Sequence, residues 1–391
     1  MELLPFFKPV EAEKYFPQNK SIDPHLLVSH VWFTSKEQEP DLSNINIVII
    51  GVPESRLSNN NEGCEEAPDE IRKQFYKLFL WKNNVSILDL GNLIPGKTIE
   101  DTYVILSDIL AFLIEQEILP IIVGGSNDLV FANYKAYANL EKIVNIVAVD
   151  SKFDIGNEKE PITSEAYLNK IVLQQPNYLL NYSNIGYQTY LNSQADIELM
   201  QQLFFETYRV GGLRKDMDEI EPIVRNAEMV ALDISAVRQS DAPGNANASA
   251  NGFYGEEICQ VARFAGLSDK LSSFGIYEYN PLLDYNTQTS QLIAHVLWYF
   301  IEGYSHRQND ILFKEQDQYI RNTVPITNAL NELVFHQSKK TGRWWLEVPF
   351  FHIKKQQDKI YYLPCSKNDF ETACKDVVPD RWWRAYNKLN R

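Results

Sequence analysis

The sequence has few cysteines, few positive charges for its size and no long hydrophobic run. Its four cysteines form no C-x-x-C pair, which argues against disulfides or a zinc knuckle and favours a reducing compartment. The net charge of −15 argues against nucleic acid as a partner, because phosphates would be repelled. The N-terminus lacks the basic start of a signal peptide, and acidic residues interrupt the most apolar segment, 103–123. We therefore expect a cytoplasmic protein without a membrane span.

What the sequence does contain is an alternation of short apolar runs and longer helical patterns. The runs that predict strands are 46–51, 85–91, 118–125, 143–150, 182–187, 229–235 and 274–280, with a short one near 204–210. The patterns that predict helices are 68–79, 98–116, 193–202, 255–265 and 287–302. Because the strand runs are apolar on both faces, we expect a three-layer α/β/α domain around a mostly parallel sheet of about eight strands.

The chain is expected to divide into three parts. An N-terminal extension (1–44) precedes the α/β domain (45–304), and a C-terminal extension (305–391) follows it. From 336 to 391 the chain carries 12 Lys/Arg against 6 Asp/Glu, and four of the seven tryptophans lie there. Segments 343–351 and 358–364 predict a hairpin, with short helices after it. We expect this basic, aromatic extension to pack on the acidic body; an RNA-binding role is the less favoured alternative.

Polar residues follow the predicted strands at their carboxyl ends, where open α/β sheets bind ligands. These ends read GGSND (124–128), DSKFD (150–154), DIS (233–235) and EYNP (278–281). No G-x-G-x-x-G or G-x-x-x-x-G-K-[ST] motif is present, so a nucleotide cradle is not indicated. His295 lies within an apolar helical pattern and is predicted to be a core residue.

The order of these segments resembles the ureohydrolase family, which comprises arginase, agmatinase and formimidoylglutamase. The matching segments are GGSND, DSKFD, ALDISAVRQSDAPG (231–244) and EYNP, with GVPES (51–55) and APDEIR (67–72) upstream. The resemblance covers about 45–304 and is nearest to formimidoylglutamase. It implies two manganese ions held by four aspartates and two histidines, with a bridging hydroxide that attacks a guanidinium or formimino carbon.

This chain departs from the implied ligand set at half of its positions. Asp150, Asp154 and Asp233 stand where aspartate ligands belong. The other three ligand positions hold Asn127 and Lys152 for the two histidines and Ser235 for the fourth aspartate. Arg238 stands at the last aspartate of the motif. No histidine occurs between His30 and His295 that could substitute.

The losses fall mainly on one of the two implied metal positions. Asp150, Asp154, Asp233 and Asn127 form an all-oxygen set that suits a single Mn²⁺, Mg²⁺ or Ca²⁺ ion. The other position would contain the Lys152 ammonium, which would repel a divalent ion roughly 4 Å away by about 8 kcal/mol at an effective dielectric near 20. We therefore expect no ion or one divalent cation, with Lys152 in place of the second. If Arg238 also turns inward, the pocket needs no metal.

Each of these residues also has a simpler interpretation. Asp150 and Asp233 can cap the following backbone turns, Asn127 can be a turn former, and Lys152 can extend into solvent. Glu278 lies where family members hold the cationic group of the substrate, but it can instead pair with Lys152.

The sequence predicts a ureohydrolase-fold protein that has lost its dinuclear site and is non-catalytic. It would bind a small nitrogen-rich ligand, or act as a scaffold, a homo-oligomer or a protein partner. The alternative is a formimidoylglutamase-like hydrolase of linear amidines with one metal or a rewired pocket, in which Lys152 acts as acid or base. The predicted pocket residues are Asn127, Asp128, Lys152, Ser235, Arg238 and Glu278.

Overall fold

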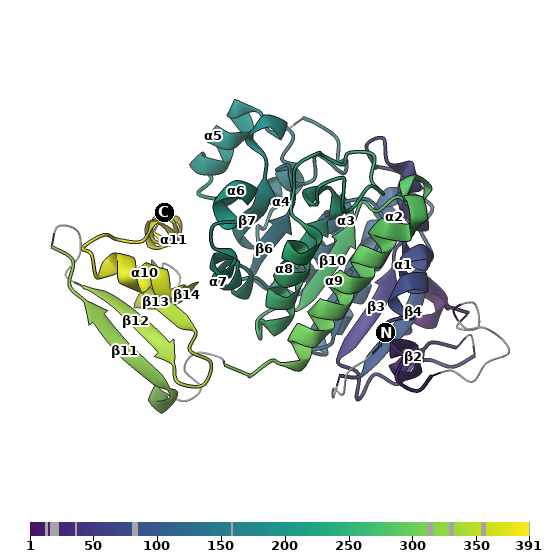
Figure 1. Cartoon of the computed structure of the whole chain (residues 1–391), viewed down its shortest axis with the longest axis horizontal. Coiled ribbons are helices and arrows are strands. Elements are labelled where there is room, and N and C mark those ends of the chain that lie inside the picture. Colours follow the sequence, from purple (N-terminus) through teal and green to yellow (C-terminus); the bar gives the residue numbers. More distant parts are fainter. Residues whose placement is uncertain are drawn as a thin grey trace.

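The computed structural model describes residues 1–11, 15, 23–35, 37–79, 85–157, 159–310, 316–327, 332–352 and 357–390. A ten-stranded sheet forms the centre of the body, in the order β1-β4-β3-β5-β10-β9-β6-β7-β8, with β2 beside β4 (Figure 1). All of its strands pair in parallel except β1. The strands are β1 (Phe7–Lys8), β2 (Val31–Phe33), β3 (Ile47–Gly51), β4 (Ile87–Leu93), β5 (Leu119–Val123), β6 (Val144–Val149), β7 (Leu179–Tyr187), β8 (Glu206–Arg209), β9 (Met229–Asp233) and β10 (Ser273–Tyr277).

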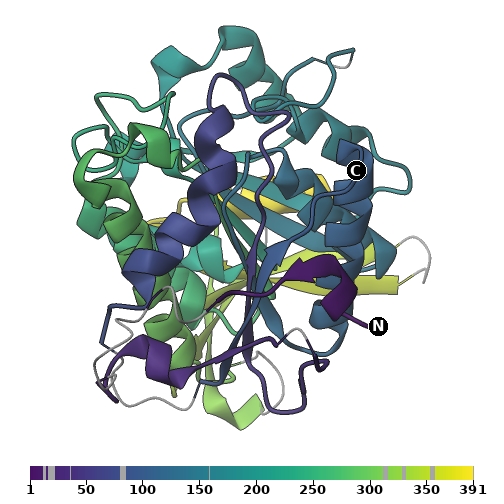
Figure 2. The same cartoon turned by 90° about the vertical axis from the view of Figure 1, so that its right-hand side faces the viewer.

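Helices cover both faces of this sheet, and each face has its own apolar core (Figure 2). One core contains side chains of α1 (Ala67–Phe75), α6 (Val210–Leu213), α7 (Ile220–Arg225), α8 (Gly255–Leu267) and α9 (Gln288–Ser305). The other contains side chains of α2 (Ile99–Glu115), α3 (Leu129–Asn139), α4 (Leu168–Leu173) and α5 (Gln194–Gln202). Helix α2 begins with a Thr98–Asp101 capping box, which satisfies free N–H groups of the first turn.

The predicted three-layer α/β architecture is confirmed, and the sheet is larger than expected. The difference comes from the N-terminal segment, because β1 and β2 add to β4 at one edge. The prediction for His295 is wrong, since this residue is exposed on α9 while its neighbours Ala294 and Val296 are buried. No helix in the described part of the chain is long and apolar enough to cross a membrane.

The C-terminal part contains a second, antiparallel sheet. Its strands are β11 (Tyr319–Val324), β12 (Leu333–Ser338), β13 (Trp344–His352) and β14 (Gln357–Cys365), in that order, followed by α10 (Lys367–Ala373) and α11 (Asp380–Leu389). The pairing of β13 with β14 confirms the predicted hairpin. Trp382 of α11 is buried against Phe335 and Leu346 of this sheet, so the part has a core of its own.

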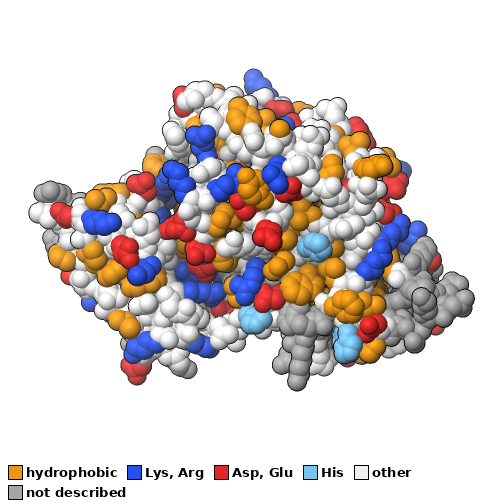
Figure 3. Space-filling view, viewed as in Figure 1, with side chains coloured by type: hydrophobic (Ala, Val, Ile, Leu, Met, Phe, Trp, Pro, Cys, Tyr) orange, Lys and Arg blue, Asp and Glu red, His pale blue; other side chains and the backbone are white. Residues whose placement is uncertain are grey.

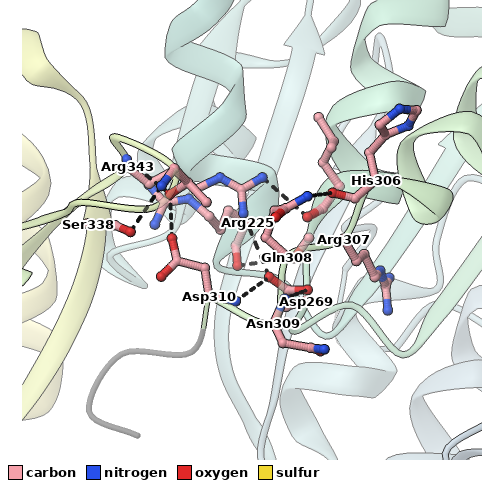
Figure 4. A network of polar contacts seen from close by, with 12 residues as sticks. Arg225, Asp269, His306, Arg307, Gln308, Asn309, Asp310, Ser338 and Arg343 are labelled. Atoms are coloured by element: carbon pink, nitrogen blue, oxygen red, sulfur yellow. Dashed lines mark hydrogen bonds and ion pairs between the residues drawn. The ribbon is translucent and has the colours of Figure 1, made fainter. Parts of the chain in front are cut away.

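Arginines join the C-terminal part to the body. The guanidinium of Arg225, at the end of α7, donates to the carbonyls of Trp344 (3.1 Å) and Cys365 (3.3 Å) and lies 4.4 Å from the Trp345 ring centre. Arg343 pairs with Glu221 at 3.1 Å. Figure 4 shows Arg225 and Arg343 in the polar network at this junction, and Figure 3 shows acidic and basic side chains intermixed over it. Because Arg225 precedes β9, this junction lies at the amino ends of the strands.

Candidate metal and ligand site

Four neighbouring strands of the sheet, β5, β10, β9 and β6, deliver polar side chains to the opposite, carboxyl-end edge. Asn127 follows β5, Asp150 follows β6, Asp233 ends β9 and Glu278 follows β10. The turn after β5 needs Gly125, which has φ +81°, and a Cβ there would lie 2.8 Å from the Val52 carbonyl oxygen. The parallel order of the strands thus brings together residues up to 151 positions apart in the sequence.

Three aspartates form a buried cluster at this edge. Asp150, Asp154 and Asp233 each place a carboxylate oxygen so that the three oxygens lie within 4.8 Å of one another. Their exposed fractions are only 2, 6 and 7%. Asp154 reaches the cluster because its backbone turns back at φ +49°, a conformation uncommon for residues other than glycine. Such a group of carboxylates can hold a metal ion.

Two of the aspartates also cap the following turns. Asp150 Oδ1 accepts the N–H of Lys152 at 2.8 Å, and Asp233 Oδ1 accepts the N–H of Ser235 at 2.6 Å. A carboxylate has a second oxygen and further lone pairs, so capping leaves each residue able to bind a cation. The capping interpretation and the ligand interpretation are therefore compatible.

The side chain of Asn127 faces the aspartates. Its Nδ2 lies 2.9 Å from Asp154 Oδ2 and 3.3 Å from Asp150 Oδ2, and its Oδ1 is buried without a hydrogen-bond partner. A cation among the carboxylates would favour the opposite amide orientation, with Oδ1 toward the cluster. The orphaned amide oxygen therefore fits a role as fourth oxygen ligand.

The electrostatics of the cluster call for a cation. Burial, together with the neighbouring Asp233 carboxylate, raises the pKa of Asp154 to about 8. Burial and the nearby acids also raise the pKa values of Asp150 and Asp233 well above the usual range. Burial and Asp233 raise the pKa of Glu278 to about 8. Charged carboxylates crowded away from water are destabilising unless protons neutralise them or a cation compensates them.

Lys152 does not supply this compensation by contact. Its Nζ pairs with Glu165 Oε1 at 2.5 Å, and Glu165 also accepts Asn59 Nδ2 at 2.8 Å. Within the described part of the chain, no ion pair joins Lys152 to Asp150, Asp154 or Asp233. The lysine lies with Glu165 at a hollow of about 350 Å³, which is also lined by Asp154, Asn157, Glu160, Asn192 and Asp196.

Glu278 is held by amides rather than by Lys152. The backbone N–H of Asn127 donates to its Oε1 and the side chain of Asn61 to its Oε2, both at 2.8 Å. Sequence reasoning missed both Asn61 and Glu165. Asn61 lies in the polar run SNNNEG after β3, and Glu165 lies in a segment without a recognisable motif, so neither gave a signal.

The remaining predicted pocket residues lie apart from the aspartates or contribute little charge. Asp128 is buried and accepts hydrogen bonds from Ser126 and from Tyr103 of α2. Arg238 pairs with Asp241 at 2.9 Å and lies over the Tyr254 ring, so it is not turned toward the cluster. Ser235 is buried, with its Oγ 3.5 Å from the Oγ of Ser151.

The model of the arginase family matches residues 45–302, and the chain belongs to this family. Formimidoylglutamase of Bacillus subtilis (strain 168) is 25% identical over 283 residues, covering 65% of this chain and 86% of that protein. Formimidoylglutamase of Staphylococcus haemolyticus is 25% identical over 287 residues, covering 69% and 91%.

Solved structures agree on the fold. The Bacillus subtilis formimidoylglutamase structure has a TM-score of 0.64 at 21% identity and covers 75% of this chain and 98% of that one. Trypanosoma cruzi formiminoglutamase, solved with Mn²⁺, has a TM-score of 0.61 at 18% identity and covers 68% and 95%. The expected resemblance to formimidoylglutamases is thus confirmed.

Proposed function

We propose that this protein binds one divalent cation through Asp150, Asp154, Asp233 and Asn127 and holds a small nitrogen-rich ligand beside it, without two-metal hydrolysis. The observation that carries the proposal is the convergence of three buried carboxylates that no protein cation contacts. A divalent ion bound there would act as a Lewis acid on a ligand atom or water.

A single ion is favoured because the second position lacks suitable donors. Besides the shared Asp150 and Asp233, that position has only a neutral serine hydroxyl, Ser235, and Lys152. An ammonium donates hydrogen bonds and cannot ligate a metal while it is protonated. Because Lys152 pairs with Glu165 and not with an aspartate, no side-chain cation of the described residues occupies the cluster, which favours one ion over none.

The ligand chemistry follows from the charge that remains. Three ionised aspartates around one divalent ion leave −1, and Glu278 in its ionised form adds a further negative charge. A planar cation with N–H donors, such as an amidinium or guanidinium group, matches a carboxylate in charge and in shape. The names of the relatives support a linear amidine as the ligand class.

A second candidate function is hydrolysis of a linear amidine with one metal ion. The observation in its favour is that Lys152 does not occupy the aspartate cluster, so an ion and an activated water remain compatible with the site. In this reading Lys152 exchanges a proton with the ligand as general acid or base. Against it stands the loss of both imidazoles, which removes the usual residues for proton transfer near neutral pH.

Metal stoichiometry tests the main proposal. Protein purified with Mn²⁺ should contain one ion per chain, and Asp233→Ala should abolish it. The triple variant Asn127→His, Lys152→His, Ser235→Asp should bind two. Two ions in the natural protein, or none, would contradict the proposal.

Product release separates the two candidates. Mn²⁺-loaded protein is incubated with arginine, agmatine or formimidoylglutamate, and urea, formamide and ammonia are measured. Binding without products supports the main proposal. Products that disappear in Asp233→Ala support the hydrolase instead.

A further inference from the structure

Glu278 adopts a backbone conformation that needs support. Its φ of +65° is uncommon for a residue with a side chain and costs free energy unless neighbouring groups hold it. Its N–H donates to the Gly125 carbonyl at 2.9 Å, and its own carbonyl accepts the side-chain amides of Asn61 (2.9 Å) and Asn245 (2.7 Å). Two asparagine side chains thus fix the backbone at this position.

Asn61 alone reaches both the backbone and the carboxylate of Glu278. Its Nδ2 donates to the carbonyl oxygen at 2.9 Å and to Oε2 at 2.8 Å. Its Oδ1 accepts Asn280 Nδ2 at 3.0 Å and the Ala246 N–H at 3.1 Å. The amide is 0% exposed, so every donor and acceptor position of this side chain is committed to the surrounding loops.

The loop that carries Asn61 is packed too closely to shift. A Cβ added at Gly63 would lie 2.2 Å from Asn280 Oδ1, so a larger residue there would displace the Asn280 side chain, which donates to Asn61. The position of the Asn61 amide is therefore set by its surroundings before any ligand binds.

The partners of the Glu278 carboxylate are all neutral. One oxygen takes the Asn127 N–H and the other takes Asn61 Nδ2, and no ion pair reaches Glu278 from any residue that the structure describes. Each oxygen keeps further acceptor capacity, and no cation in the described part of the chain pairs with the carboxylate. An arginine in place of Asn61 would fix the carboxylate equally well but would abolish its attraction for a cation.

We propose that Asn61 is the positioning residue of the ligand pocket: it orients the Glu278 carboxylate toward the cationic group of the ligand while leaving its charge available. This inference rests on the proposed function, in which Glu278 receives the cation of an amidine or guanidine. Asn245 provides the matched comparison, because it binds the same carbonyl without touching the carboxylate.

Calorimetry of Mn²⁺-loaded protein with agmatine tests the role. Asn61→Ala should weaken agmatine binding by at least about 10-fold, the effect of losing a hydrogen bond to a charged group. The affinity for Mn²⁺ should stay within about threefold of the natural protein's, since no ligand is removed. Asn245→Ala should leave agmatine affinity within the same margin. Equal losses in both variants, or no loss in Asn61→Ala, would overturn the proposal.

A structural readout decides the matter independently of the probe. Asn61→Asp keeps an oxygen that accepts from Asn280 and Ala246 but replaces the donor to Glu278 by a second buried carboxylate. In a crystal structure of this variant, the Glu278 carboxylate should have left the Asn127 N–H; an unmoved carboxylate refutes the positioning role. Failure of the natural protein to bind agmatine would count against the proposed function and leave this test in force.

Discussion

Replacement of Asp154 by asparagine should stabilise the metal-free protein and lower its affinity for a divalent metal ion. The pKa of Asp154 rises from its ordinary 3.8 to about 8 in the fold, mainly through burial. At about 1.4 kcal/mol per unit, the charged carboxylate costs up to about 6 kcal/mol. We expect Asp154→Asn to recover on the order of 2–3 kcal/mol, because the remaining aspartates share the repulsion and the amide must also be hydrogen-bonded.

The sign of this effect fixes its pH dependence. The folded protein binds the Asp154 proton more tightly than the unfolded chain does. Asp154 therefore costs no folding stability below about pH 4 and costs more as the pH rises toward 8. The advantage of Asp154→Asn should therefore be small near pH 5 and largest above pH 8. For a chain of this length, 2–3 kcal/mol corresponds to a rise in Tm of about 2–4 °C.

Thermal unfolding in EDTA and in Mn²⁺ measures both effects. With Mn²⁺ the order should reverse, because only the natural protein gains the stabilisation from tight binding. Asp376→Asn is the control for the preference of asparagine for such a backbone, because Asp376 is exposed and has φ +63°. Asp376 also accepts the Thr327 N–H at 2.8 Å, a bond that an asparagine oxygen can accept as well. A lower Tm of metal-free Asp154→Asn at pH 8 would refute the picture of uncompensated carboxylates.

Three further variants test other contacts. Lys152→Met should change the free energy of unfolding by less than about 1 kcal/mol, because its pair with Glu165 is partly exposed. The Mn²⁺ affinity should change by less than about threefold; a large gain in affinity would show that the ammonium faces the ion. Gly63→Ala should lower the free energy of unfolding in urea by about 1–3 kcal/mol, because the new Cβ clashes with Asn280. An unchanged urea midpoint would contradict the close approach of Gly63 to Asn280. Trp382→Ala should cost about 3–5 kcal/mol and raise hydrogen exchange in strands β11 to β14 and helices α10 and α11 but not in the body. Uniform exchange would contradict a separate core.

The sequence allowed the sheet and the backbone of the site to be predicted because both follow from strand patterns. Apolar runs located the central strands, and their polar ends placed Asn127, Asp150, Asp233 and Glu278 at one edge. Strands such as β1, with two residues, carry no periodicity and were missed. Strand β11 was missed because half of its six residues are polar and only one, Val324, is buried.

Side-chain directions could not be predicted in the same way. A long lysine can reach several carboxylates, and Glu165, 13 residues away, binds Lys152 where the nearby aspartates were expected to. Arg238 likewise pairs with Asp241 instead of turning inward. Which carboxylate such a cation contacts depends on tertiary distances and competing solvation, and local spacing contains neither.

The strongest argument for an external cation comes from how the same protein treats its other buried acids. Asp89 is 0% exposed, and Arg72 binds both of its oxygens, at 2.8 and 2.9 Å. Glu54, which is 2% exposed, pairs with Arg56. In the described chain, no such partner contacts the aspartate cluster or Glu278. A lone buried acid can instead be held by hydroxyls, as Ser126 and Tyr103 hold Asp128. Three adjoining carboxylates without an arginine are best explained as a site for a cation that binds from solution.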